Sequence, residues 1–167
     1  MIKKPQKTIS NRQKAYEKAR TFCAYQERTQ EEVRQRLSQW GWYGDEAEEI
    51  IVELISENFI NEERFAKIYA GGKFRIKKWG RMKIKQALKN KNLSTYCIQQ
   101  AMKEINDEDY ENTLMALIEK KQEALQKIAP EESEAIKNLK IAQYLISKGY
   151  ENDWIWLCLK KWKETQL

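Results

Sequence analysis

The chain of 167 residues contains no histidine, two prolines, six glycines, and three cysteines without a Cys-x-x-Cys pair. The absence of histidine removes the commonest general base and the commonest metal ligand. The cysteine spacing excludes a sulfur-rich zinc or iron site. Neither of the glycine-rich phosphate-binding motifs occurs. We therefore expect no catalytic residue, no metal site and no cofactor, and we do not expect an enzyme.

Long apolar runs are also missing. The longest spans residues 154–159, far short of the ~18 residues that a membrane span needs, and no apolar stretch follows the basic N-terminus as in a secretory signal. The three cysteines are odd in number and widely spaced, which favours reduced thiols in a cytosol over disulfide bonds. Hydrophobic residues still make up 41% of the chain, too many for a disordered protein. These features predict a soluble, basic intracellular protein. We expect it to be cytoplasmic and monomeric and to make no contact with a membrane.

The scarcity of proline and glycine argues against a many-stranded sheet, and apolar residues recur at three- and four-residue steps, which is typical of helices. We expect an all-α protein with nine helices, over residues 11–27, 30–40, 45–57, 62–78, 81–91, 95–105, 108–127, 131–148 and 152–164. Boundary signals support these ranges: a capping box at Thr29 and Glu32, N-caps at Asn61 and Ser94, and Pro130 in a first helical turn.

An internal repeat organises these helices. When Leu37, Leu88 and Leu145 are aligned, the flanking residues fall into register without gaps. Four residues downstream come residues that tolerate a left-handed helix end, followed by a large apolar residue. These pairs are Gly41-Trp42, Asn92-Leu93 and Gly149-Tyr150. One irregular nine-helix domain would not explain the shared register.

The chain therefore reads as three tandem three-helix repeats, over residues 11–60, 61–106 and 107–165, with a flexible N-terminal tail over residues 1–10. Each repeat alone has too few residues for a stable core, so neighbouring repeats must pack together. We expect an elongated or curved rod that binds a large partner rather than enclosing a small molecule.

Charge is concentrated in the second repeat. Residues 64–91 carry eleven lysines and arginines and no acidic residue, whereas residues 41–63 carry eight acidic residues and no basic one. Charge runs are usually solvated helix faces, but such faces normally mix both signs. Tyr69, Phe74 and Trp79 also interleave with the cations. A single-signed face of this kind attracts a polyanion or an acidic protein surface.

The junction of the first two repeats reads Asn61-Glu-Glu-Arg-Phe-Ala66, and residues 73–88 continue as a basic helix, an aromatic-glycine turn and a basic-Ile-x-x-x-Leu pattern. This order of elements resembles the signature of RecX-family regulatory proteins. The first repeat agrees, with Thr29-x-x-Glu32 followed by Leu37 and Gly41. The turn Lys78-Trp79-Gly80 departs from the commoner Gly-Tyr-Gly form of the family. The resemblance covers about residues 16–105 clearly and the third repeat more loosely.

The resemblance implies a non-enzymatic protein that binds the RecA recombinase or its filament on DNA. It implies inhibition of ATP hydrolysis, strand exchange and RecA-stimulated cleavage of the LexA repressor, and hence a role in recombination, DNA repair and the SOS response. Family proteins do so by occupying the filament groove or by blocking filament extension, and the sequence does not decide between these two modes.

The matching basic segment supplies our candidate contacts with RecA or DNA: Lys73, Arg75, Lys77, Lys78, Trp79, Arg81, Lys83 and Lys85. The alternative function is nonspecific binding of single- or double-stranded DNA through this second repeat. Specific base recognition is disfavoured, because residues 80–91 offer few side chains other than phosphate-binding cations.

Overall fold

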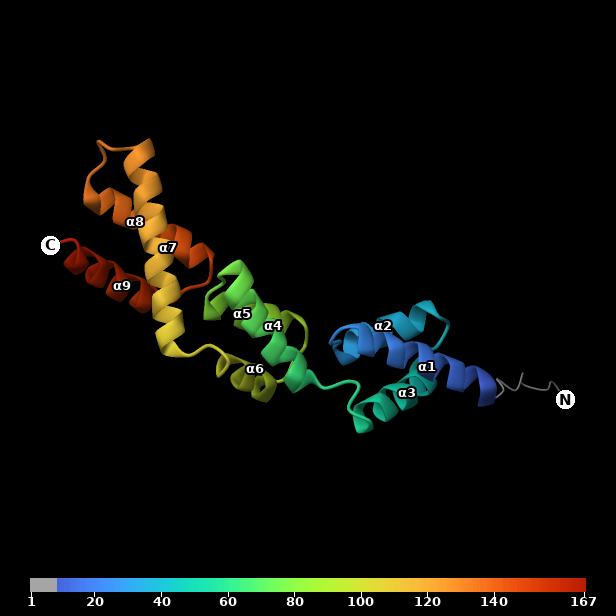
Figure 1. Cartoon of the computed structure of the whole chain (residues 1–167). Coiled ribbons are helices and arrows are strands. Elements are labelled where there is room, and N and C mark those ends of the chain that lie inside the picture. Colours follow the sequence, from blue (N-terminus) through green and yellow to red (C-terminus); the bar gives the residue numbers. More distant parts are fainter. Residues whose placement is uncertain (1–8) are drawn as a thin grey trace. The chain divides into compact units, whose positions relative to one another are not determined.

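A computed structural model describes residues 9–167 of the chain, and the regular structure within them is helical throughout (Figure 1). The helices are α1 (Ile9–Tyr25), α2 (Gln30–Gln39), α3 (Gly44–Ser56), α4 (Glu62–Lys77), α5 (Arg81–Asn90), α6 (Thr95–Met102), α7 (Asp107–Ile128), α8 (Glu134–Ser147) and α9 (Asn152–Thr165). The all-α helical-repeat fold predicted from the sequence is confirmed. In the described part of the chain no helix is long and apolar enough to cross a membrane.

Two local predictions need correction. Helix α8 begins at Glu134 with Ser133 as its N-cap, so Pro130 precedes the helix instead of opening it. Helix α1 begins at Ile9, inside the segment predicted as a flexible tail, and residues 1–8 of that segment lie outside the described residues. The predicted capping box is present, since the Thr29 hydroxyl accepts from the Glu32 amide and the Glu32 carboxylate accepts from the Thr29 amide.

The repeat register is visible in the backbone of three equivalent turns. Gly41, Asn92 and Gly149 all have left-handed φ values, of 84°, 60° and 94°. In each turn the amide of the next residue donates to the carbonyl of the aligned leucine, and those leucines are fully buried. The pairs are Trp42 with Leu37 at 3.0 Å, Leu93 with Leu88 at 3.4 Å, and Tyr150 with Leu145 at 3.1 Å. This is the helix-ending motif that a left-handed residue makes possible.

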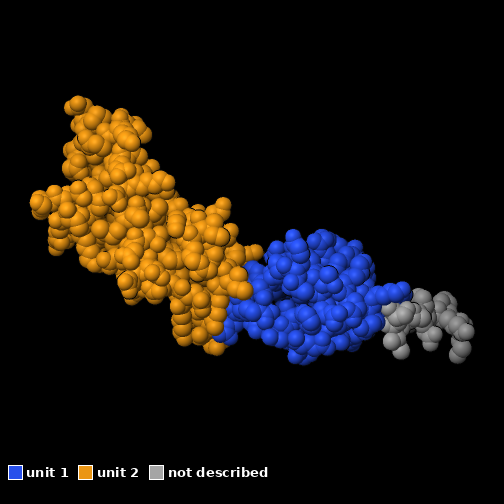
Figure 2. All heavy atoms as spheres, viewed as in Figure 1, with its two compact units in different colours: residues 1–65 blue, residues 66–167 orange. Residues whose placement is uncertain are grey.

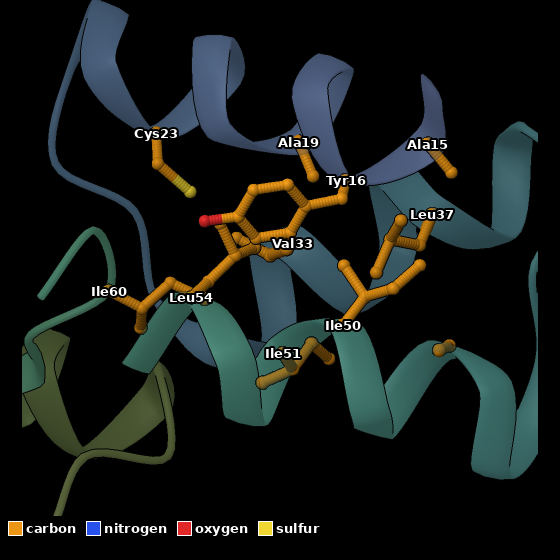
Figure 3. Close-up of a cluster of buried hydrophobic side chains, with 11 residues drawn as sticks. Ala15, Tyr16, Ala19, Cys23, Val33, Leu37, Ile50, Ile51, Leu54 and Ile60 are labelled. Carbon is orange, nitrogen blue, oxygen red and sulfur yellow. The ribbon is translucent and has the colours of Figure 1, made fainter. Parts of the chain in front are cut away.

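The chain divides into two compact units, residues 1–65 and residues 66–167 (Figure 2). Unit 1 has its own core, in which apolar side chains of α1, α2 and α3 face one another (Figure 3). Tyr16 and Cys23 of α1, Leu37 of α2 and Leu54 of α3 all belong to this core. The four side chains are each at most 6% exposed.

Unit 2 contains most of the second repeat and the whole of the third. Helix α7 packs along α9, and α8 contacts both. Tyr110 of α7 and Tyr150 are the largest fully buried side chains of the described residues. The Tyr110 ring lies 5.1 Å from the ring of Tyr150 and 5.5 Å, edge-on, from that of Trp154. These aromatic contacts join the start of α7 to the turn before α9 and to α9 itself.

Candidate interaction surface

The candidate residues lie at the end of α4, in the turn over residues 78–80, and at the start of α5. Helix α4 runs through Gly71 and Gly72 without a break and ends at Lys77. Lys78 then adopts a left-handed φ of 57°, and its amide donates to the Phe74 carbonyl at 3.1 Å. A left-handed residue after the last helical residue reverses the chain direction. The turn therefore joins the cations at the end of α4 directly to those at the start of α5.

Exposure divides the candidates into three groups. Five cations are exposed: Arg75, Lys77, Lys78, Lys83 and Lys85. Lys73 and Trp79 are half-buried. The Arg81 side chain is only 14% exposed. We call the five exposed cations, together with Lys73 and Trp79, the basic face.

Two aromatic rings hold lysines of the second repeat in place. The ammonium nitrogens of Lys73 and Lys83 lie 5.0 and 4.6 Å from the centre of the Trp79 ring. Lys73 also lies 5.3 Å from the Tyr69 ring, and Lys91 lies 5.6 Å from it. Cations are attracted to the electron-rich faces of aromatic rings, at about 0.5–1 kcal/mol per exposed contact. These contacts keep positive charges together that would otherwise repel one another.

The basic face is electrostatically uncompensated. Within residues 9–167, none of its six cations forms an ion pair with a carboxylate. In contrast, Arg64, at the start of α4, pairs with Glu27 at 2.6 Å inside unit 1. An array of like charges without counter-charges raises the local potential and attracts anionic partners. The arrangement is suited to binding an acidic surface or a phosphate backbone.

Arg81 lies apart from these cations and holds unit 2 together. Its guanidinium Nη2 donates to the Ile105 carbonyl oxygen at 2.9 Å and to Asp107 Oδ1 at 2.6 Å. The guanidinium carbon lies 4.1 Å from the centre of the Tyr110 ring. The Arg81 amide donates to the Tyr110 hydroxyl oxygen at 3.1 Å, and that hydroxyl donates to Glu151. Arg81 therefore packs the second repeat against the third.

The turn before α5 is fixed against the turn after α8. The Gly80 amide donates to the Lys148 carbonyl at 2.7 Å, and the Met82 amide donates to the Gly149 carbonyl at 3.0 Å. A Cβ atom on Gly80 would lie 2.3 Å from the Gly149 backbone, so only glycine fits there. The Tyr150 hydroxyl also donates to the Lys78 carbonyl at 2.9 Å. We call this contact between the two turns the glycine junction.

Sequence reasoning missed both the glycine junction and the role of Arg81. A glycine at the N-cap of α5, with no side chain to cap the helix, was a signal that the backbone approaches something closely. Nothing in the local sequence distinguishes the role of Arg81 from that of Lys83 or Lys85.

The Tyr110 hydroxyl beside Arg81 stays protonated. Burial and the hydrogen bond to Glu151 raise the pKa of the Tyr110 phenol, so its hydroxyl remains able to donate.

Residues 9–167 contain no cluster of three or more His, Cys, Asp or Glu side chains placed to hold a metal ion. Burial raises the pKa of the Cys23 and Cys158 thiols to about 11, so both are protonated near neutral pH. Cys97 is half-exposed.

Comparison with known proteins gives a consistent result. Two family models match the chain: the first three-helix domain of RecX over residues 15–54, and the second three-helix domain of RecX over residues 61–102. Regulatory protein RecX from Bacillus cereus strain AH820 is 30% identical over 154 residues, and so is RecX from Bacillus anthracis strain A0248. These matches cover 92% of this chain and 56% of each relative, so the chain spans about half the length of the curated relatives it matches.

Solved structures agree with this result. The crystal structure of RecX from Lactobacillus salivarius is similar with a TM-score of 0.83 and 26% identity, covering 93% of this chain and 99% of that one. A second crystal structure, of a regulatory protein RecX, has a TM-score of 0.77 and 21% identity, covers 89% of this chain and 71% of that one, and supports the fold. The tandem three-helix repeats, the two domain matches and the curated relatives together place this chain in the RecX family of regulatory proteins.

Proposed function

We propose that this chain is a non-enzymatic regulator that binds the RecA recombinase, or RecA assembled on DNA, and inhibits it. The activities affected are ATP hydrolysis, strand exchange and stimulated repressor cleavage. Membership of the RecX family supports a regulatory role. The observation that carries the proposal is the basic face, with six cations that form no ion pair within the described part of the chain.

The basic face suits a partner that combines acidic protein surface with DNA phosphates. Lys77 and Lys78 at the end of α4 and Lys83 and Lys85 in α5 are all exposed. The glycine junction fixes the turn between these helices. Because the backbone of this turn is already fixed, less conformational entropy is lost there on binding than in a mobile loop.

The direct test is ATP hydrolysis by the cognate RecA on single-stranded DNA, titrated with this protein. We expect a dose-dependent fall. Half-maximal inhibition far below the RecA concentration indicates capping of filament ends, whereas a near-equimolar requirement indicates coating of the groove. No change at equimolar, correctly folded protein would refute the proposal.

Charge variants link inhibition to the basic face. The quadruple variant Lys77→Gln, Lys78→Gln, Lys83→Gln and Lys85→Gln removes four exposed cations without touching Arg81. The matched control replaces four exposed lysines of the third repeat whose side chains form no hydrogen bond or ion pair with the described residues: Lys120, Lys127, Lys160 and Lys163, each to Gln. We expect the first variant to lose inhibition and the control to keep it. Equal inhibition by both variants would exclude the basic face as the contact.

Trp79, with Lys73 and Lys83 beside its ring, favours a second candidate function, the nonspecific binding of DNA. Aromatic rings next to cations bind single strands by stacking and phosphate contact. DNA binding without RecA, measured on the same two quadruple variants, tests it. If the basic-face variant loses DNA affinity and still inhibits RecA, DNA binding by this face is dispensable for regulation. Affinity should fall steeply with salt if phosphates are neutralised.

A further inference from the structure

A second surface of different character lies on α1 and α2 of unit 1. Two hollows of about 300 and 520 Å³ adjoin there, and Lys18 and Trp40 line both. Trp42 lines the first hollow, and Phe22 and Tyr25 line the second. Trp40 and Phe22 are half-buried against the core of unit 1, while Tyr25 is 83% exposed. We call this set of four aromatic residues and their hollows the aromatic groove.

The repeat register shows that the groove is particular to the first repeat. Trp40 occupies the position held by Lys91 in the second repeat and by Lys148 in the third. The fold therefore accepts a lysine at this position. A three-helix repeat therefore does not need a tryptophan at this position. We look for the reason for Trp40 in what its side chain contacts.

The distribution of ion pairs supplies a second, independent observation. Residues 9–65 contain eight lysines and arginines. Four of them pair with carboxylates: Arg12 with Glu53, Arg20 with Glu17, Arg34 with Glu31 and Glu48, and Arg64 with Glu27. The other four have no carboxylate partner among the described residues: Lys14, Lys18, Arg28 and Arg36.

All four of these unpaired cations border the aromatic groove. Lys14 lines the first hollow, and the Lys18 ammonium lies 4.9 Å from the Trp40 ring centre. The guanidinium carbons of Arg28 and Arg36 lie 3.9 and 4.9 Å from the Phe22 ring centre. Glu17 is the one carboxylate that lines either hollow, and it is already paired with Arg20 at 2.8 Å. The groove is thus apolar at its centre and positive at its rim.

The charge of the rest of unit 1 distinguishes between possible anionic partners. Residues 9–65 carry twelve carboxylates against eight cations, a net charge of −4, and five of the carboxylates lie in α3. A nucleic acid extends its charge over many nucleotides and would also meet this negative field. A short acidic peptide places its charge only at the rim, where it is attracted. Aromatic residues and arginine are also the types enriched at protein–protein contacts.

We propose that the aromatic groove of α1 and α2 is a docking site for an acidic polypeptide segment with one large apolar anchor residue. The anchor enters the hollows beside Trp40, and flanking carboxylates pair with Lys18, Arg28 and Arg36. The site lies on unit 1 and shares no residue with the basic face of unit 2. The docking proposal can therefore succeed or fail independently of the proposal that the chain regulates RecA.

The test uses the full chain and a set of labelled acidic peptides, each ten to twelve residues long, rich in Asp and Glu, with one central Phe, Trp, Leu, Ile or Met. Matched peptides replace the anchor by Ser or the acids by Gln, and a single-stranded oligonucleotide serves as the competing ligand. Binding is measured by fluorescence anisotropy and by shifts of the tryptophan indole N–H resonances.

The informative variant is Trp40→Lys, which installs the residue of the sister repeats and should keep the fold. We expect it to weaken the best anchored peptide by about tenfold or more. The double variant Lys18→Gln with Arg36→Gln should weaken binding several-fold and reduce its salt dependence. The controls Trp156→Gln, at an exposed tryptophan of α9, and Lys120→Gln should bind as the wild type does.

Three results would overturn the proposal. One is that no acidic anchored peptide binds the wild-type chain. Another is that Trp40→Lys, shown to be folded by its circular dichroism, binds the peptides with unchanged affinity. The third is that the oligonucleotide binds the groove, with indole shifts of Trp40, more tightly than every peptide, which would identify a nucleic-acid site instead.

Discussion

The substitution Arg81→Ala should destabilise unit 2 substantially, although Arg81 stands in a run of exposed cations. The charged hydrogen bond to the Ile105 carbonyl contributes about 1.5 kcal/mol. The contact with the largely buried Tyr110 ring contributes about 1 kcal/mol. Asp107 is 76% exposed, so solvent screening limits its ion pair with Arg81 to about 0.5 kcal/mol. We therefore expect a loss of about 3 kcal/mol in the free energy of unfolding.

The assay is urea and thermal unfolding followed by circular dichroism, with hydrogen exchange resolved along α5, α7 and α8. A loss of this size should lower the melting temperature of unit 2 by about 10 °C. It should also speed exchange at the Gly80 and Met82 amides, which donate across the glycine junction. The matched control is Arg75→Ala, because Arg75 is an exposed cation of the same segment.

The control variant should unfold within about 0.5 kcal/mol of the wild type. Equal stability of Arg81→Ala and Arg75→Ala would refute the assignment of Arg81 to packing. It would return Arg81 to the group of cations available to a partner.

Three further predictions concern other groups. Lys78→Gly should raise the free energy of unfolding by about 0.5–1 kcal/mol in urea titrations, because glycine adopts the left-handed φ of 57° without steric cost; a decrease would contradict this. A thiol reagent at neutral pH should label Cys97 first, since Cys23 and Cys158 are buried and burial raises their pKa to about 11; mass spectrometry of the labelled peptides measures the order. Burial and a hydrogen bond to Glu57 raise the pKa of Tyr16 from 10.0 to about 12, so the stability that this phenol contributes is complete below pH 10 and is lost as pH rises toward 12. Relative to the wild type, Tyr16→Phe should therefore lose less stability between pH 10 and 12 in alkaline unfolding curves.

The helical repeat could be predicted because its signals are local. Each repeat ends its second helix with a leucine, a residue that tolerates a left-handed backbone, and an apolar residue, and all three turns form the same hydrogen bond. The start of α8 was predicted wrongly because two competing signals lie close together. Pro130 fits a first helical turn, but Ser133 is the better N-cap. The Ser133 hydroxyl accepts a hydrogen bond from the Ile136 amide at 3.3 Å, whereas a proline side chain cannot accept a hydrogen bond from a free amide at the start of a helix.

The roles of individual cations could not be predicted, since they depend on contacts distant in sequence. Arg81 is buried because Asp107 and Tyr110, 26 and 29 residues away, surround it. Lys83 and Lys85 stay exposed two and four residues further along the same helix. A single sequence shows the density of charge along a segment, but the packing of the third repeat decides which members of that segment face solvent.

One position that is equivalent in the three repeats shows how a repeated fold acquires different surfaces. Trp40 lines the aromatic groove of the first repeat. Its equivalent Lys91 lies over Tyr69 in the second, and Lys148 donates from its ammonium to the Lys77 carbonyl in the third. The backbone that carries these side chains is the same helix end in all three repeats, closed by the same hydrogen bond. Because that backbone tolerates tryptophan and lysine alike, substitution at this position can change what a repeat contacts without changing how it folds.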